Sequence, residues 1–391
     1  MTATAANAHG LDGTLVEPDW PPLTRDEVRL VLRGFDLHSG SVELLTVSPR
    51  PFSAASVVRL GPHSESRRVF VKRHARAVRT AAGLWEEHAF MAHLRTHGAS
   101  VPHVLADRSG ATAIELDEWT YEVHELPHGI DVYEDAISWT PFLHAAHAHA
   151  AGRTLAGLHL AARGYDAPAR THRPLVAGFS IFSAQNPYAA LQSYLSAHPK
   201  LRTYLQNITW LAEAMNLLAP FHSELLPLLP ALTPLWTHND LHPSNLFWSD
   251  ASEAAHGTTA IDFGLCDRTN AVHDIAHAIE RSIVEWLVLV ENPEIPERVP
   301  IHLDHLILLL AGYESIRPLS KEERAALAPL TALCHVEFAL SEADYFLTVL
   351  DSEEKTRIAC ESYLLGHARW WRGAGGKLLD RIRAWAKANS E

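Results

Sequence analysis

The order of strand-like and helix-like segments is the feature that most constrains the fold of this 391-residue chain. In the first third, short runs rich in Val and Leu are separated by Pro, Gly and Ser, and one helical segment interrupts them. The expected strands are Ser41–Ser48, Ala54–Leu60, Arg67–Lys72, Ala111–Leu116 and Trp119–Glu125, and the expected helix is Gly83–His97. This β-β-β-α-β-β order predicts a small five-stranded antiparallel sheet that carries one helix.

Beyond Pro127–Gly129 the chain becomes rich in Ala and Leu, and its pattern is mainly helical. Helices are expected within 139–164, 189–228 and 301–387, and short strands and loops within 235–274. A further helix is expected after Thr24, because Thr24 and Glu27 have the spacing of a capping box. The sequence therefore predicts an α+β fold with two lobes: a strand-rich lobe over 1–123, a hinge over 124–129 and a helical lobe over 130–391.

Composition argues against several classes of protein. The chain has 33 basic and 46 acidic residues, a net charge of −13, whereas nucleic-acid binding requires a basic surface. The longest apolar run, Leu306–Ala311, is far shorter than the ~20 residues of a membrane span. The first ten residues lack the basic and apolar parts of a signal peptide, and Cys266, Cys334 and Cys360 are too scattered for a disulfide framework. We expect a cytoplasmic protein without nucleic-acid or membrane partners.

Two acidic motifs carry the chemistry of the sequence. Thr237–Phe247 reads T-H-N-D-L-H-P-S-N-L-F, and Ile261–Gly264 reads I-D-F-G. Asp262 follows Asn245 by 17 residues, which leaves room for a short hairpin. Phosphoryl transfer requires a carboxylate that orients a hydroxyl and accepts its proton, and hard oxygen ligands for Mg²⁺. Asp240 fits the first requirement, and Asn245 and Asp262 fit the second.

A cation for the nucleotide phosphates is expected from the strand-rich lobe. Lys72 ends the run V-F-V-K, and a half-buried lysine needs a carboxylate partner. Glu87 is the expected partner rather than the neighbouring Glu86, because apolar residues three, four and seven positions later place Glu87 on the inward face of the helix.

Together these residues resemble the aminoglycoside phosphotransferase and choline kinase-like enzymes of the phosphotransferase enzyme family, which have a protein-kinase-like fold. The resemblance covers about residues 40–285 in the expected order. The matching positions are His238–Asn245, Asp262–Gly264, Asp274–Ala276, Lys72, Glu87 and the hinge-like Glu125–Gly129.

The resemblance implies a role for each residue of the catalytic loop. Asp240 would be the catalytic base. His238 would brace the loop by packing, and Asp274 would hold the loop from the following helix. His242 stands where protein kinases carry a lysine near the transferred phosphate, which makes it a candidate electrophile.

The same resemblance implies binding sites for ATP and Mg²⁺. Asn245 and Asp262 would bind the metal. Lys72 would contact the ATP phosphates, and Glu87 would pair with Lys72. The adenine would lie against the hinge backbone at His124, Glu125 and Leu126.

The sequence departs from the family pattern at two places. Asn239 stands where the family usually has glycine. The loop expected over the phosphates, Arg50–Ser56, contains no glycine, although glycine normally lets backbone N–H groups approach phosphate closely. The hydroxyls of Ser53 and Ser56 would substitute for it. GTP therefore stays open beside ATP as the phosphate donor.

The acceptor and two rival functions also stay open. Residues 240–361 hold 22 acidic and 8 basic groups, which either attract a cationic acceptor or form a solvated surface. We predict ATP-dependent transfer of the γ-phosphate to a hydroxyl of a small molecule such as an amino sugar or amino alcohol. One rival is a protein Ser/Thr kinase of the same fold, against which the short 265–274 segment argues. The other is a catalytically inactive, nucleotide-binding regulatory protein.

Overall fold

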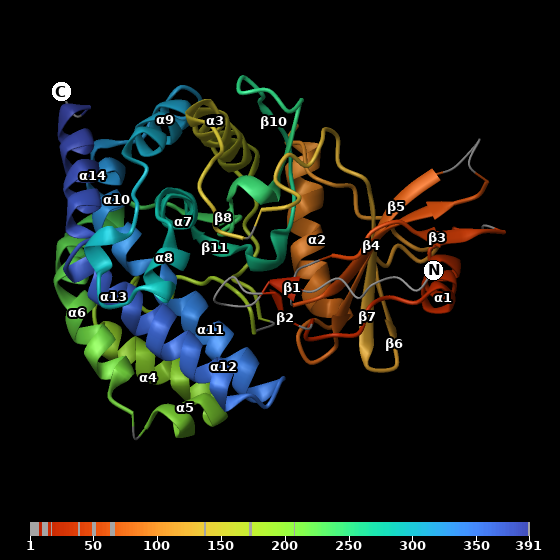
Figure 1. Cartoon of the computed structure of the whole chain (residues 1–391), viewed down its shortest axis with the longest axis horizontal. Coiled ribbons are helices and arrows are strands. Elements are labelled where there is room, and N and C mark those ends of the chain that lie inside the picture. The colour runs from red at the N-terminus through yellow and green to blue at the C-terminus, as the bar shows by residue number, and fades with distance from the viewer. Residues whose placement is uncertain are drawn as a thin grey trace. The chain divides into compact units, whose positions relative to one another are not determined.

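The chain divides into two compact units (Figure 1). The first holds Met1–His128 and Arg170–Arg173, and the second holds Gly129–Ala169 and Pro174–Glu391. The computed structural model describes residues 18–37, 40–48, 52–62, 67–136, 138–171, 174–206 and 208–389, together with the backbone of 8–9 and 15–16. The latter two segments form a short antiparallel pair, β1 (Ala8–His9) and β2 (Leu15–Val16).

A five-stranded antiparallel sheet with the strand order β3-β4-β5-β7-β6 forms the base of the first unit. Its strands are β3 (Val42–Leu44), β4 (Ala54–Leu60), β5 (Arg67–Ala75), β6 (Ala113–Leu116) and β7 (Trp119–Glu125). The predicted bounds of β4 and β7 are confirmed, whereas β5 continues three residues further and β3 is shorter than predicted. The register places Lys72 opposite Ala55 on β4 and Glu122 on β7, in the middle of the sheet.

Two helices of the first unit accompany this sheet, α1 (Arg25–Gly34) and α2 (Ala81–Thr96). α1 begins at the predicted capping box, in which the Glu27 N–H donates to Thr24 Oγ1 at 3.3 Å and the Thr24 N–H donates to Glu27 Oε2 at 3.1 Å. Glu27 also ties α1 to the sheet, because Arg73 Nη1 and the Tyr121 hydroxyl donate to its Oε1 at 2.7 and 2.6 Å.

The second unit is mainly helical. Its helices are α3 (Ala145–Ala161), α4 (Pro187–Ala197), α5 (Pro199–Leu205), α6 (Trp210–Leu225), α7 (Ala271–Ile283), α8 (Trp286–Glu291), α9 (Leu303–Glu314), α10 (Lys321–Leu333), α11 (His335–Thr348), α12 (Glu353–Ile358), the π-helical segment η6 (Ala359–Leu365), α13 (Gly366–Arg372) and α14 (Gly376–Ala388). Every residue of α7 is buried. None of the described helices combines the length with the hydropathy that a membrane-spanning helix requires.

Two glycines let α3 and α9 pack side by side (Figure 1). A Cβ atom at Gly152 would overlap the carbonyl oxygen of Leu309 and lie 2.8 Å from the Tyr313 nitrogen. A Cβ atom at Gly312 would likewise overlap the backbone of His149. The close approach depends on the absence of side chains at both positions. The Tyr313 hydroxyl of α9 lies 2.7 Å from His159 Nδ1 of α3.

Four short strands between α6 and α7 form two antiparallel pairs: β8 (Pro234–Thr237) with β11 (Asp267–Asn270), and β9 (Leu246–Trp248) with β10 (Gly257–Ala260). The β9–β10 hairpin is the one predicted between Asn245 and Asp262. Because β8 pairs with β11, the loop after β8 and the segment after β10 lie next to each other. This arrangement brings the two acidic motifs together within one unit.

Candidate active site

Asp274 holds the loop that follows β8. Its carboxylate is fully buried on α7 and accepts the backbone N–H groups of His238 at 2.9 Å and Asn239 at 2.8 Å. His159 Nε2 lies 2.9 Å from the same carboxylate. Burial alone raises the pKa of a carboxyl, but the hydrogen bonds from His159 and the loop outweigh it and hold the pKa of Asp274 below its ordinary value. Asp274 is therefore an ionised clamp on this loop.

Asn239 adopts a left-handed backbone conformation, with φ of 60°. Glycine enters this region without cost, and asparagine is among the few other residues that do so readily. Its side chain adds support, because Oδ1 accepts hydrogen bonds from the hydroxyls of Thr237 at 2.9 Å and Thr269 at 3.2 Å. The departure from the family's usual glycine is thus compatible with the turn that this position requires.

His238 joins the loop to the segment that carries Asp262. Its Nε2 donates to the Ile261 carbonyl oxygen at 2.9 Å, and its Nδ1 accepts the Asp240 N–H at 3.1 Å. These two bonds define a neutral imidazole. Burial lowers the pKa of His238, which also favours the neutral form. The ring also packs 4.5 Å from the ring of Phe263. His238 therefore has the contacts of a brace rather than those of a proton donor to a substrate.

The Asp240 carboxylate is oriented by two side chains. Asn245 Nδ2 donates to the Asp240 carbonyl oxygen at 2.9 Å and to Oδ2 at 3.2 Å. Arg281, on α7, forms an ion pair with Oδ1. His242 Nε2 lies further away, 3.9 Å from Oδ1, while its Nδ1 is 2.9 Å from the Ser244 hydroxyl. Asp240 remains partly exposed, with 16% of its side-chain surface accessible.

Asn245 and Asp262 offer the oxygen ligands that Mg²⁺ prefers. Because Asn245 donates through Nδ2, only its Oδ1 can act as a ligand. Asp262 follows β10 in a left-handed conformation with φ of 60°, and its Oδ1 lies close to Gly264, where a Cβ would be 3.4 Å away. One amide oxygen and one carboxylate suit a magnesium ion that keeps several waters, so the residues present fit this metal.

The predicted nucleotide residues belong to the first unit. Ser53 and Ser56 are buried at the start of β4, and the Ser56 hydroxyl donates to the Val57 carbonyl oxygen at 3.0 Å. Of the predicted phosphate loop, residues 50 and 51 lie outside the described residues. Glu87 is buried on α2 and lies 3.6 Å from Arg170 Nη1, a cation that the sequence did not single out. The Lys72–Glu87 pair stays a prediction.

A backbone group of the predicted hinge is already engaged, because the Glu125 N–H donates to the His103 carbonyl oxygen at 2.9 Å. Just before the hinge, the Val123 carbonyl oxygen accepts the Leu105 N–H at 2.8 Å. The backbone positions at His124, Glu125 and Leu126 therefore offer an adenine only the groups that these bonds leave. Nucleotide binding at this segment stays a prediction.

The side chain of His124 belongs to a buried cluster around Glu122. The Nε2 atoms of His74, His88 and His124 lie 2.9, 2.7 and 2.7 Å from the Glu122 carboxylate. Although burial opposes it, the three imidazoles hold the pKa of Glu122 well below its ordinary value. Glu122, His88 and His124 have the spacing of metal ligands. Because the imidazole N–H groups can all bond to the carboxylate, we interpret the group as a hydrogen-bonded cluster.

Arg281 and Glu280 are the residues near Asp240 that sequence reasoning missed. Both are fully buried on α7, and the Arg281 guanidinium lies over the rings of Trp139 at 5.2 Å and Phe338 at 5.1 Å. Burial lowers the pKa of Arg281 and raises that of Glu280 to about 8. The usable signal was the spacing from Asp274 to Arg281, which is two helical turns and places both on one face.

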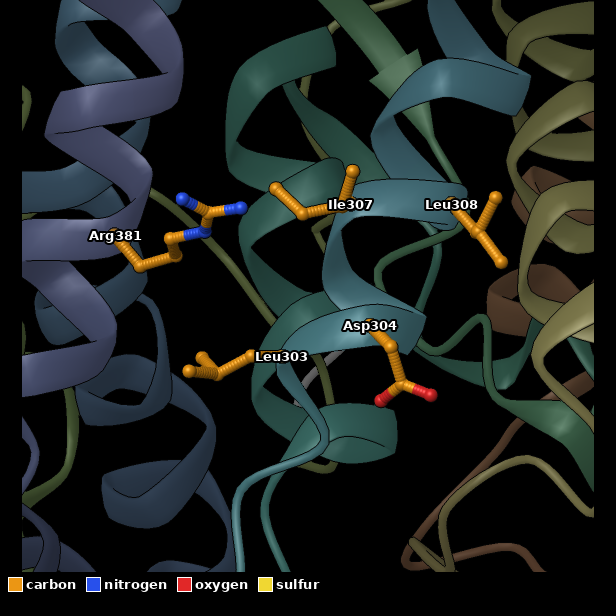
Figure 2. Close-up of a pocket in the computed structure, with 5 residues that line it drawn as sticks. All are labelled: Leu303, Asp304, Ile307, Leu308 and Arg381. Atoms are coloured by element: carbon orange, nitrogen blue, oxygen red, sulfur yellow. The ribbon is translucent and has the colours of Figure 1, made fainter.

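A separate surface pocket of about 550 Å³ lies between α9 and α14 (Figure 2). Its lining is formed by Leu303, Asp304, Ile307, Leu308 and Arg381, with the apolar side chains spread along α9. It contains none of the residues predicted for the catalytic loop or the metal.

Comparison with known proteins gives the geometry a family context. The model of a family described as the phosphotransferase enzyme family matches residues 52–319. The homoserine kinase of Gluconobacter oxydans (strain 621H) is 27% identical over 266 residues, which cover 67% of this chain and 71% of that protein.

Solved structures are similar over most of the chain. An amicoumacin kinase in complex with AMP-PNP, Ca²⁺ and its antibiotic has a TM-score of 0.54 at 15% identity, covering 88% of this chain and 96% of its own. A choline/ethanolamine kinase family protein from Mesorhizobium loti has a TM-score of 0.52 at 14% identity, covering 92% and 99%. At these identities the likeness shows the fold, which is α+β and protein-kinase-like, as predicted.

Proposed function

This chain belongs to the phosphotransferase enzyme family, and from that premise we propose that it transfers the γ-phosphoryl group of ATP, with Mg²⁺, to a hydroxyl of a small amino-bearing molecule. The family makes it a phosphotransferase with an alcohol group as acceptor. The relatives described above are named for homoserine, amicoumacin, and choline or ethanolamine. The nucleotide, the metal and the acceptor class are the parts that we propose.

One observation carries the proposal: the Asp240 carboxylate is held in place from three sides. Asp274 fixes the backbone before it, Asn245 donates to its Oδ2, and Arg281 pairs with its Oδ1. A base positioned before the substrate arrives is the arrangement that general-base catalysis requires. A carboxylate that only capped a turn would not need a buried arginine and an asparagine on its two oxygens.

In the proposed reaction, Asp240 accepts the proton of the acceptor hydroxyl as the hydroxyl oxygen attacks the γ-phosphorus. The new O–P bond forms while the bond from the γ-phosphorus to the bridging oxygen breaks, and ADP leaves. Asn245 and Asp262 would hold Mg²⁺, which would neutralise charge on the phosphate oxygens. Lys72 would contact the phosphates, and His242 would stabilise charge near the transferred group.

The segment after Asp262 supports a small-molecule acceptor over a protein acceptor. The 3-10 turn η4 (Phe263–Leu265) is followed by β11, which begins at Asp267, and α7 begins at Ala271. The chain therefore passes from the metal motif into α7 without the long segment that presents protein substrates in protein kinases.

The test is Mg²⁺-dependent ADP release, measured with ATP and in parallel with GTP, over a panel of amino alcohols, amino sugars and hydroxy amino acids. Asp240→Asn should lower kcat by ~10²–10⁴-fold, the contribution of a general base. Asp250→Asn is the matched control, because Asp250 lies in the β9–β10 turn of the same segment and bonds only to neighbouring turn residues among the described contacts. Nucleotide binding without any Asp240-dependent release would favour the inactive regulatory protein.

A further inference from the structure

The last turn of α7 carries polar side chains that are buried on all sides. Glu280, Arg281 and Ser282 are each fully buried. Within the described part of the chain, Oε2 of Glu280, Nε and Nη2 of Arg281 and Oγ of Ser282 have no hydrogen-bond partner, and Glu280 Oε1 is paired only with His367 Nδ1, at 3.1 Å. Buried polar atoms almost always have such partners, because leaving them unpaired costs free energy. Several buried polar atoms without partners at one place indicate that a polar ligand binds there.

Further polar side chains pack around this turn. Nδ1 of His335 is buried and has no hydrogen-bond partner among the described residues, whereas Nδ1 of His367 faces Glu280 and the buried Tyr363 hydroxyl interacts with Arg281. The ring of Tyr363 lies 4.6 Å from that of His367 and 5.9 Å from that of His335. We call this group the α7 polar cluster, which consists of Glu280, Arg281, Ser282, His335, Tyr363 and His367.

Arg281 connects the α7 polar cluster to Asp240. Its guanidinium pairs with the Asp240 carboxylate, and its Nε lies 3.7 Å from Glu280 Oε2. An acceptor hydroxyl has to come within hydrogen-bond reach of the base, ~3 Å. The rest of a small acceptor bound in this way would therefore lie against Arg281 and Glu280.

The chemistry of these two side chains defines what they can recognise. A planar guanidinium matches a carboxylate through two parallel N–H bonds, and Nε and Nη2 of Arg281 have no hydrogen-bond acceptor within the described part of the chain. The carboxyl group of Glu280 can accept from an ammonium group. Glu342, a second buried carboxylate, also acts electrostatically on Arg281. A zwitterion supplies both groups without adding net charge to a buried site, whereas a polycationic amino sugar places further positive charge against Arg281.

We propose that the α7 polar cluster is the acceptor-binding site and that the acceptor is a small hydroxy amino acid, with its carboxylate on Arg281 and its ammonium group on Glu280. The inference rests on the proposed function, because it takes Asp240 as the base that faces the acceptor hydroxyl. It names the substrate class that the family assignment leaves open.

Matched acceptors separate the contribution of each group. Homoserine, 3-amino-1-propanol and 4-hydroxybutyrate share a chain length and differ by the carboxylate or the amino group, and serine with ethanolamine forms a second pair. A site built to pair a polar group discriminates against an analogue that lacks the group by ~10⁴-fold or more in kcat/KM. Loss of a single charged hydrogen bond lowers kcat/KM by ~10²-fold. We expect kcat/KM to fall at least ~10²-fold when the carboxylate is removed.

Variants then assign the effect to Arg281. Arg281→Met should raise KM for the hydroxy amino acid and bring the ratio of kcat/KM with and without the carboxylate close to one. Arg281→Lys, which keeps the charge but not the fork, should recover part of that ratio. Arg324→Met is the control, because Arg324 on α10 is mostly buried in an ion pair with Glu314 but is not part of the α7 polar cluster. A purely structural effect would lower activity for all acceptors equally and leave the ratio unchanged.

Binding without turnover distinguishes failure of the inference from failure of the proposed function. Thermal stabilisation by hydroxy amino acids but not by their decarboxylated analogues, lost in Arg281→Met, supports the acceptor site even in the absence of phosphoryl transfer. Asp240-dependent transfer to ethanolamine, choline or amino sugars at equal or better kcat/KM overturns the inference and leaves the phosphotransferase intact. No stabilisation by any carboxylate also overturns it.

Discussion

Glu280→Gln tests the electrostatics of α7 through the pH dependence of stability. Burial raises the pKa of Glu280 to about 8, compared with an ordinary value of 4.5. Between these values the folded protein holds a proton that the unfolded chain releases, so the free energy of unfolding falls as pH rises through this window. Each pH unit is worth about 1.36 kcal/mol, which gives about 5 kcal/mol over the 3.5 units between 4.5 and 8.

The assay is urea unfolding of wild type and Glu280→Gln at several pH values from 5 to 8.5, followed by tryptophan fluorescence. Glutamine has nearly the same shape as glutamate and does not titrate. Between pH 5 and pH 8, the free energy of unfolding of the variant should therefore rise by about 4 kcal/mol relative to that of wild type. Glu361→Gln is the control, because Glu361 is a surface carboxylate of the same unit, 43% exposed and paired with Arg357. The free energies of unfolding of Glu361→Gln and wild type should differ by no more than about 0.5 kcal/mol at every pH.

A difference in the free energy of unfolding between Glu280→Gln and wild type that does not change with pH would refute this reasoning. It would mean that Glu280 is ionised in the folded protein, with its charge balanced by Arg281 Nε at 3.7 Å and His367 Nδ1 at 3.1 Å. Tyr363 and Cys334 also respond to the Glu280 charge, so their titration would then shift with it. The measurement therefore decides between a protonated carboxyl and a buried ion pair.

Two further predictions concern the framework around the site. Gly152→Ala should destabilise the protein by at least about 2 kcal/mol, because the new Cβ would overlap the carbonyl oxygen of Leu309. Gly157→Ala in the same helix is the control: its Cβ meets no atom within 4 Å, and it should stabilise the protein by about 0.5–1 kcal/mol. Chemical unfolding of both variants measures the two changes. Asp274→Asn should lower kcat by ~10²-fold or more, since an amide has one acceptor oxygen for two loop N–H groups. An Asp274→Asn enzyme with unchanged kcat would show that the loop does not need this clamp.

Local sequence signals located the strands and the hairpin well. β4 and β7 begin and end where the pattern placed them, because Pro, Gly and polar residues flank short apolar runs at both ends. The Thr24 capping box predicted the start of α1, because its signal lies within four residues. The close packing of α3 on α9 at Gly152 was not predictable, since it depends on a partner helix far along the chain.

The polar end of α7 shows why the site was only partly predictable. A helix with charged residues at 274, 280 and 281 normally presents a solvated face, and only its enclosure by other elements makes those charges buried. The aromatic rings that contact Arg281 come from Trp139 and Phe338, about 140 and 57 positions away in the chain. The spacing of Asp274 and Arg281 can be read from the sequence, but the burial of Arg281 depends on tertiary packing, which pattern and motif do not encode.

The spacing of residues along α7 nevertheless explains how one helix contacts the catalytic loop at two points. Asp274 and Arg281 are seven residues apart, two turns of one helix, and therefore lie on the same face. Asp274 binds the backbone of the catalytic loop, and Arg281 binds the carboxylate of Asp240 in that loop. Glu280, one position before Arg281, is turned by about 100° and faces His367 instead. One buried helix thus positions the base and carries the groups proposed to recognise the acceptor, so a change in acceptor specificity at Arg281 would act directly on Asp240.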